Sequence, residues 1–181
     1  MIFRTERTHR RAREFEEFVT REGQGLIDFA TWSAIVVDRG LPWETWPQEL
    51  RDPRSEAVAK ERERLADEVE FQCWLQWIVQ SQLADAQREL LAAGMGVGVV
   101  HDLAVGVHPG GADAWALQDA MAPGVSVGAP ADMYNQLGQD WSQPPWDPRK
   151  LAEAGYRPWR QMLGNIFRHG GGVRIDHVAG L

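Results

Sequence analysis

The chain has 181 residues, and its 26 acidic side chains outnumber the 19 lysines and arginines, which gives a formal net charge of -7 at pH 7. The length suits one domain with a substantial core, and the acidic balance argues against a nucleic-acid partner, because phosphate binding needs a basic face. Cys73 is the single cysteine, so no disulfide can form within the chain, and we expect a cytoplasmic protein.

The first part of the chain is predicted to be helical. Residues 11–38 carry apolar side chains at helical spacing, and Gly23 and Gly25 mark a break between two helices. The apolar stretch 29–37 is interrupted by polar residues and is far shorter than the ~20 residues that a membrane span needs. We therefore expect no membrane partner.

A proline-interrupted loop follows at residues 41–47, and its Trp43 and Trp46 either pack into the core or face a ligand. Asp52 and Pro53 predict the start of the next helix, because aspartate caps a helix and proline fits its first turn.

From Leu65 this helix is apolar nearly all round, which predicts burial on several sides until Gly94 ends it. Residues 97–105 are then continuously apolar except for the pair His101 and Asp102. That pattern is typical of a strand buried on both faces of a parallel sheet.

A second helix-to-strand unit lies at the end of the sequence. Asp147 and Pro148 predict a short helix that ends at Gly155, and a further helix is expected over 158–169. Three glycines then lead into a strand that begins at Val173.

Arg174, Asp176 and His177 gather at the far end of that last strand. The carboxyl ends of parallel strands are where α/β folds place their chemistry, so these side chains form either a site or a salt-bridged strand end. Two strands with polar ends, joined by helices, point to a doubly wound sheet or a (β/α)8 barrel.

The connection between the two units, residues 108–146, is long enough to indicate a functional loop, with one short helix at 112–121. It combines aromatic rings with amides and carboxylates, which suits sugar binding, although a self-packed surface loop explains the composition equally well. The side chains that suggest a sugar site are Asp132, Tyr134, Asn135, Gln136, Gln139, Asp140, Trp141, Gln143 and Trp146.

Four motifs stand in the order in which a known enzyme family carries them. They read His-Asp-Leu-Ala-Val-Gly-Val at 101–107, Gly-Ala-Asp-Ala-Trp at 111–115, Gly-Ala-Pro-Ala-Asp-Met-Tyr-Asn at 128–135 with Gly-Gln-Asp-Trp at 138–141, and Arg-Ile-Asp-His at 174–177. On these motifs the chain resembles the amylomaltases, the 4-alpha-glucanotransferases of glycoside hydrolase family 77. The resemblance extends over nearly the whole chain.

The resemblance implies an α/β fold, as a partial (β/α)8 TIM barrel with a helical insertion. Residues 1–96 would form the insertion and the helix leading into the barrel, and residues 97–181 a barrel segment with two strands and a substrate-covering loop. The family usually has Pro-Pro-Asp where Pro130, Ala131 and Asp132 stand, so the shape of that loop is expected to differ. Members are several hundred residues long, and we expect an internal fragment with an incomplete barrel.

The resemblance also implies a function and a site. Asp176 would be the nucleophile of a retaining enzyme that transfers alpha-1,4-glucan segments between maltooligosaccharides, and Arg174 would keep it ionised. No metal or other cofactor is implied, and nothing indicates the oligomeric state. The acid/base glutamate would lie beyond Leu181, so the 181 residues alone are expected to be inactive. The substrate-binding residues would be Asp102, Asp132, Tyr134, Gln139, Trp141 and His177.

Two other functions stand against this one. His101, Asp102, Asp176 and His177 could ligate a metal ion, although their spacing matches no known ligand pattern. The chain could also be a non-catalytic carbohydrate-binding or helical interaction module, because one carboxylate cannot perform a reaction that needs two.

Overall fold

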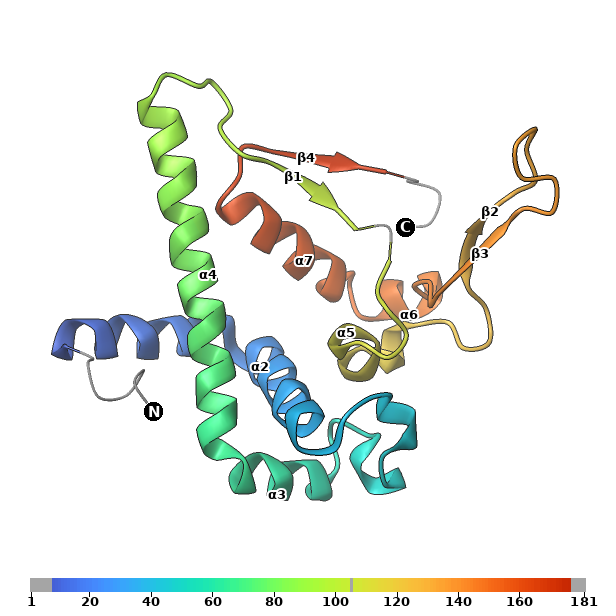
Figure 1. Ribbon diagram of the computed structural model, residues 1–181, viewed down its shortest axis with the longest axis horizontal. Helices are drawn as coiled ribbons and strands as arrows, with labels where there is room; N and C mark the ends of the chain where they lie inside the picture. The colour runs from blue at the N-terminus through green and yellow to red at the C-terminus, as the bar shows by residue number, and fades with distance from the viewer. Residues whose placement is uncertain (1–7, 105, 177–181) are drawn as a thin grey trace. The chain divides into compact units, whose positions relative to one another are not determined.

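The computed structural model describes residues 8–104 and 106–176, so Val105 and His177, both used in the predictions above, lie outside it. The chain divides into two units, Met1–Gln82 and Leu83–Leu181. Within the described residues, no helix is both long and apolar enough to cross a membrane. The elements, labelled in Figure 1, are α2 (His9–Arg39), η1 (Trp43–Thr45), η2 (Gln48–Leu50), α3 (Glu56–Arg64), α4 (Ala66–Ala92), β1 (Val100–Leu103), α5 (Ala112–Ala116), η3 (Gln118–Ala120), β2 (Val127–Ala129), β3 (Gln139–Gln143), α6 (Pro148–Glu153), α7 (Arg157–Arg168) and β4 (Gly172–Ile175).

Helix α2 of the first unit is bent at Gly23, whose φ of 61° and ψ of -142° are not helical. Glycine reaches this region because it has no Cβ to clash with the backbone. Thr8 caps the helix, since its hydroxyl accepts a hydrogen bond from the Arg11 amide at 3.3 Å. The predicted break between two helices is confirmed at Gly23, whereas Gly25 lies inside the second helical stretch.

The core of the first unit joins α2 to the first part of α4. The rings of Phe15 and Trp77 pack with centroids 5.7 Å apart. The buried residues of α4 are spaced four positions apart, whereas Val79 is 49% exposed. The prediction of burial on several sides is therefore wrong. The described residues cover one face of this helix rather than all of them. The core cluster consists of Phe15, Phe18, Leu26, Ala30, Ala34, Val69, Cys73 and Trp77.

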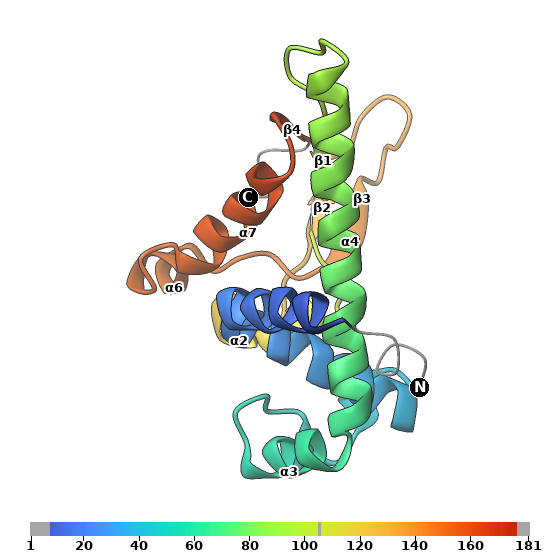
Figure 2. The ribbon, with the colours of Figure 1, turned by 90° about the vertical axis from the view of Figure 1, so that its left-hand side faces the viewer.

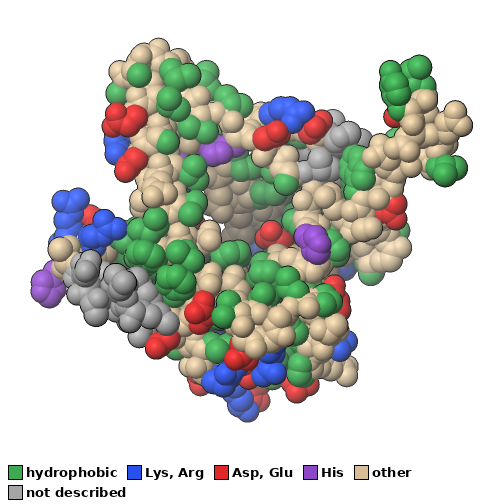
Figure 3. All heavy atoms as spheres, in the orientation of Figure 1, with side chains coloured by type: hydrophobic (Ala, Val, Ile, Leu, Met, Phe, Trp, Pro, Cys, Tyr) green, Lys and Arg blue, Asp and Glu red, His purple; other side chains and the backbone are tan. Residues whose placement is uncertain are grey.

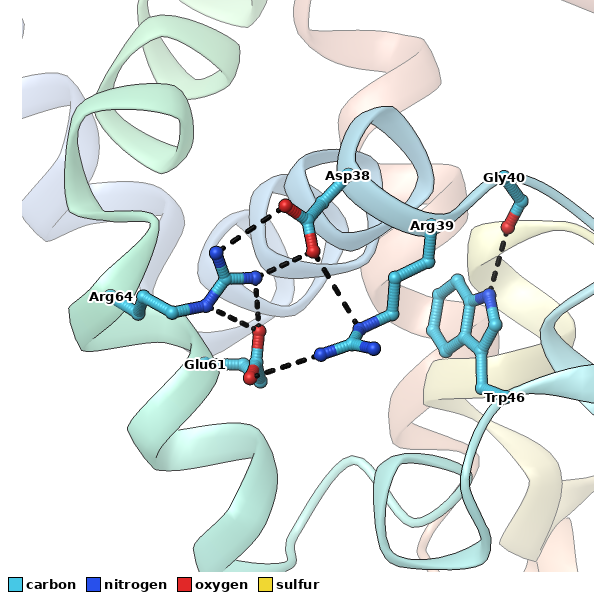
Figure 4. Close-up of polar contacts among 6 residues, drawn as sticks. All are labelled: Asp38, Arg39, Gly40, Trp46, Glu61 and Arg64. Atoms are coloured by element: carbon cyan, nitrogen blue, oxygen red, sulfur yellow. Dashed lines mark hydrogen bonds and ion pairs between the residues drawn. The ribbon is translucent and has the colours of Figure 1, made fainter.

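The loop after α2 turns Trp46 into the protein, where it is 2% exposed. Its indole Nε1 donates to the Gly40 carbonyl at 2.8 Å (Figure 4). Of the two alternatives for this tryptophan, core packing is therefore the one observed.

The predicted start of the next helix at Asp52 is wrong by a few residues. Asp52 instead accepts a hydrogen bond from the Arg54 amide at 2.8 Å and so closes a turn. The helix begins at Glu56, because the Ser55 hydroxyl takes the capping role and accepts from the Val58 amide at 3.1 Å.

Ion pairs tie the last turn of α2 to α3 (Figure 4). Arg64 donates to Asp38 at 2.6 Å and to Glu61 at 2.6 Å, and Arg39 reaches Glu61 at 3.3 Å. Hydrogen bonding to Arg64 lowers the pKa of the Asp38 carboxyl below its ordinary value. These four residues bring together the ends of helices that are joined by a long loop.

In the second unit β1 and β4 pair in parallel, as predicted, with Val100 opposite Gly172 and Leu103 opposite Ile175. Helix α6 leads into α7, and α7 packs beside β4 (Figure 2). The expected burial of β1 on both faces is wrong, since Val100 is 58% exposed. Among the described residues each of these strands has a single strand neighbour, which leaves much of the pair uncovered.

Local signals set the ends of several elements in this unit. After α4, Gly94 has a φ of 90°, and its amide donates to the Leu91 carbonyl while the Met95 amide donates to Leu90, a Schellman ending. Asp147 caps α6 by accepting from the amides of the second and third residues that follow it. Both of these helix ends were predicted.

A hairpin of β2 and β3 lies within the long connection and was not predicted. The two strands run antiparallel, with Gly128 opposite Asp140. A Cβ at Gly128 would lie 2.0 Å from the Gln139 carbonyl oxygen, so only glycine allows this approach. The predicted helix at 112–121 is present as α5 followed by η3.

Candidate functional site

The structure brings Asp102, Arg174 and Asp176 together at the carboxyl ends of the parallel strands. The Arg174 Nη1 atom donates to Asp102 Oδ1 at 2.9 Å and to Asp102 Oδ2 at 2.8 Å. Its Nη2 atom donates to Asp176 Oδ2 at 2.8 Å. One guanidinium thus bridges two carboxylates from different strands.

The register of the two strands produces this arrangement. Asp102 is the direct partner of Arg174, so their side chains leave the same face of the sheet. Asp176 follows Arg174 by two residues and therefore points to that face as well. Leu103 and Ile175 occupy the next paired position and alternate with the polar residues.

The electrostatics of the cluster follow from these contacts. Hydrogen bonds from Arg174 to Asp176 and to Asp102 raise the pKa of the guanidinium above its usual range, and the two negative charges add to this. The predicted contact between Arg174 and Asp176 is present, whereas the role of Asp176 as a nucleophile stays a prediction.

Within the described residues, the structure provides no further ligand for the alternative prediction of a metal site. The His101 ring nitrogen Nε2 lies 3.3 Å from the His169 carbonyl oxygen. Among residues 8–104 and 106–176, no three His, Cys, Asp or Glu side chains are grouped so that they could hold a metal ion. His177 lies outside the described residues.

Most of the predicted sugar-binding side chains of the long connection lie on the β2–β3 hairpin, whose tip is separate from the β1–β4 pair (Figure 1). Trp146, which follows β3, is the exception. Asp132 Oδ1 accepts hydrogen bonds from the amides of Tyr134 at 2.8 Å and Asn135 at 2.6 Å, so this carboxylate shapes the tip. On β3, Trp141 Nε1 donates to Gln139 Oε1 at 3.2 Å.

Large apolar side chains gather at this tip (Figure 3). Met133 is 80% exposed, Tyr134 is 89% exposed and Leu137 is 99% exposed. The turn that Asp132 closes therefore presents an apolar surface to the outside.

The base of the hairpin lies near the end of β1. A Cβ at Gly106 would lie 2.7 Å from Gln143 Oε1, which places the last residue of β3 directly against the segment that follows β1. The hairpin is thus anchored beside the strand that carries Asp102, although its tip extends away from that strand (Figure 1).

The contact between Asp102 and Arg174 was not predicted from the sequence, although both residues were expected at strand ends. Each is a charged residue followed by an apolar residue inside a short strand, and this shared pattern was the available signal. The two residues are 72 positions apart, so their register could not be derived from local sequence.

Comparison with known proteins gives consistent matches. The sequence profile of a family described as 4-alpha-glucanotransferase matches residues 1–181. The 4-alpha-glucanotransferase of Mycobacterium tuberculosis (strain ATCC 25618 / H37Rv) is 53% identical over 181 residues, which are 100% of this chain and 25% of that protein. That of Haemophilus influenzae is 30% identical over 183 residues, covering 94% of this chain and 26% of that protein. The chain spans about a quarter of the length of these curated relatives.

Solved structures agree with the sequence matches. The crystal structure of amylomaltase from Corynebacterium glutamicum is 49% identical and superposes with a TM-score of 0.82, covering 99% of this chain and 23% of that one. The amylomaltase from Streptococcus agalactiae in complex with acarbose has a TM-score of 0.84 at 20% identity, covering 96% of this chain and 36% of that one. The second match concerns the fold alone. Together they confirm the predicted mixed α/β architecture.

Proposed function

We propose, because the chain belongs to the 4-alpha-glucanotransferase family, that its residues contribute the nucleophile to an enzyme that transfers alpha-1,4-glucan segments between maltooligosaccharides. The observation that carries this proposal is the cluster of Asp102, Arg174 and Asp176 at the carboxyl ends of two parallel strands. Sites of α/β barrels are built at that edge.

The proposed reaction is a double displacement in which Asp176 acts first. Its ionised carboxylate attacks the anomeric carbon, the bond to the leaving oxygen breaks, and a general acid protonates that oxygen. In this proposal the general acid lies outside the 181 residues. A hydroxyl of a second sugar then gives up its proton to the same group and attacks the anomeric carbon, which releases Asp176 and retains the configuration.

Arg174 supports the first step by keeping Asp176 ionised and oriented. The guanidinium contact at 2.8 Å favours the charged form of the carboxylate, which is the form that can attack.

The finer architecture and the substrate site belong to the same proposal. Residues 1–96 form a helical insertion, β1 and β4 of residues 97–181 are strands of a (β/α)8 barrel, and the enzyme serves glucan metabolism in the cytoplasm. Glucose rings stack on exposed aromatic side chains, and hydroxyls bond to the neighbouring polar groups. The residues proposed to bind the glucan are Asp132, Tyr134, Gln139, Trp141 and His177, and Asp102 lines the same site.

The test is Asp176→Asn in the whole enzyme, with glucose release from maltotriose as the assay. The variant keeps the shape of the side chain and removes its charge, so transfer should fall by several orders of magnitude while maltotriose still binds. The matched control is Asp85→Asn, which removes a carboxylate paired with Arg88 on the exposed surface of α4. The control should transfer at the wild-type rate. Transfer at the control rate by the Asp176→Asn enzyme would refute the assignment.

A further inference from the structure

The guanidinium of Arg174 makes two unequal sets of contacts. Its Nη1 atom is held by both oxygens of Asp102, at 2.9 and 2.8 Å, whereas its Nη2 atom makes one contact with Asp176. Arginine has several rotatable side-chain bonds, so one contact would leave its planar head free to turn. The carboxylate of Asp102 removes that freedom and directs Nη2 toward Asp176.

Within the 181 residues, fold stability does not account for this ion pair. In this chain Arg174 is 58% exposed and Asp102 is 63% exposed. Exposed ion pairs contribute on the order of 0–1 kcal/mol, since water solvates the separated charges nearly as well. The arrangement is therefore better explained by what it does to Asp176 than by what it does to the fold.

The contacts also divide one positive charge between two negative ones. If Arg174 contacted Asp176 alone, its full positive charge would stabilise the carboxylate electron pair that must attack the sugar. The carboxylate would then be a weaker nucleophile. Asp102 takes up part of that charge and leaves Asp176 oriented yet still nucleophilic. By this route Asp102 acts on the carboxylate of Asp176 through Arg174.

We propose that Asp102 is a positioning residue that acts on Asp176 through Arg174, and that its contribution to the reaction does not come from a hydrogen bond to the glucan. This inference rests on the proposed function, because it requires Asp176 to be the nucleophile. It also specifies how a residue that lines the glucan site acts there.

The experiment is a double-mutant cycle in the whole enzyme, using Asp102→Asn, Arg174→Gln and the double variant, with maltotriose as substrate. Loss of the orientation that Asp102 gives to Arg174 and Asp176 should lower kcat by about 10- to 100-fold and leave KM nearly unchanged. The double variant should be within about twofold of Arg174→Gln alone, because the effect of Asp102 requires the arginine. The unfolding midpoints of Asp102→Asn and of the Asp85→Asn control are measured alongside, so that a loss of folded enzyme is separated from a loss of kcat.

Two results would overturn the inference. Asp102→Asn could raise KM at constant kcat, or its loss could add in full to that of Arg174→Gln, and either would assign Asp102 to direct glucan binding. The kcat and KM of the single variant decide the matter even where the double variant is too slow to measure. Failure of the proposed function is a separate result, since it requires transfer to survive in Asp176→Asn.

Discussion

Removal of Arg54 should destabilise the first unit more than removal of its anionic partner. Arg54 Nη1 donates to Asp28 Oδ2 at 2.6 Å, and Gln24 Nε2 donates to Asp28 Oδ1 at 2.7 Å. The side chain of Asp28 is 8% exposed, whereas that of Arg54 is 53% exposed. Asp28 therefore depends on Arg54 more than Arg54 depends on Asp28, because water cannot easily reach the buried carboxylate to replace the lost contact.

The structure sets the size of this effect. Loss of one partner of a fully buried ion pair costs about 3–5 kcal/mol, but Gln24 still bonds to Asp28 and the exposed side of the pair admits water. We expect Arg54→Ala to lower the free energy of unfolding by about 2 kcal/mol. Asp28→Ala removes the buried charge itself and lets Arg54 extend into water, so its cost should be about 1 kcal/mol or less.

The double variant gives the sharpest test. Asp28→Ala combined with Arg54→Ala leaves no unpaired buried charge, and it should be more stable than Arg54→Ala alone by about 1 kcal/mol. Urea unfolding followed by tryptophan fluorescence measures all three variants. Arg88→Ala, which breaks an exposed pair with Asp85, is the control and should change stability by less than about 0.5 kcal/mol. A double variant less stable than Arg54→Ala would show that the pair is not governed by the burial of Asp28.

Gly23→Ala should lower the free energy of unfolding by about 1–3 kcal/mol, since an L side chain is strained at a φ of 61°. Gly25→Ala, in the helical part of the same element and with open space around it, should instead be neutral or stabilising by up to about 1 kcal/mol in the same urea titration. Arg64 holds the folded pKa of Asp38 below 3.8, so this carboxylate stabilises the fold above that pH and the benefit is lost as the pH falls through the lowered pKa. Asp38→Asn should therefore lower the thermal midpoint at pH 7 but not in strong acid, and an equal difference at both would contradict the assignment.

Elements with a local cause could be predicted from the sequence. The break at Gly23, the end of α4 at Gly94 and the cap at Asp147 each depend on the residue at that position and its immediate neighbours. The start of α3 was placed wrongly because Asp52 and Ser55 are both good capping residues, and the choice between them depends on how the loop folds. The β2–β3 hairpin was missed because β2 has only three residues and β3 carries mainly polar residues in place of alternating apolar ones.

In the candidate site too, a contact between near neighbours in the sequence could be predicted, whereas a contact between distant residues could not. The contact of Arg174 with Asp176 spans two residues and follows from strand geometry alone. The contact of Arg174 with Asp102 depends on the register of two strands that are far apart in sequence, which no local pattern specifies. The outward position of Tyr134 depends on the turn that Asp132 closes, which is a local contact.

The separation of 72 residues between Asp102 and Arg174 has a consequence for the order of folding. Closing a flexible loop of that length costs on the order of 4 kcal/mol in chain entropy before the first strand contact forms. The hairpin and the helices α5, α6 and α7 lie inside this loop and rest on contacts between near neighbours, so they can form earlier and shorten the segment that remains to be closed. We therefore expect the β1–β4 pair to form late and the charged cluster to be among the first features lost when the chain begins to unfold.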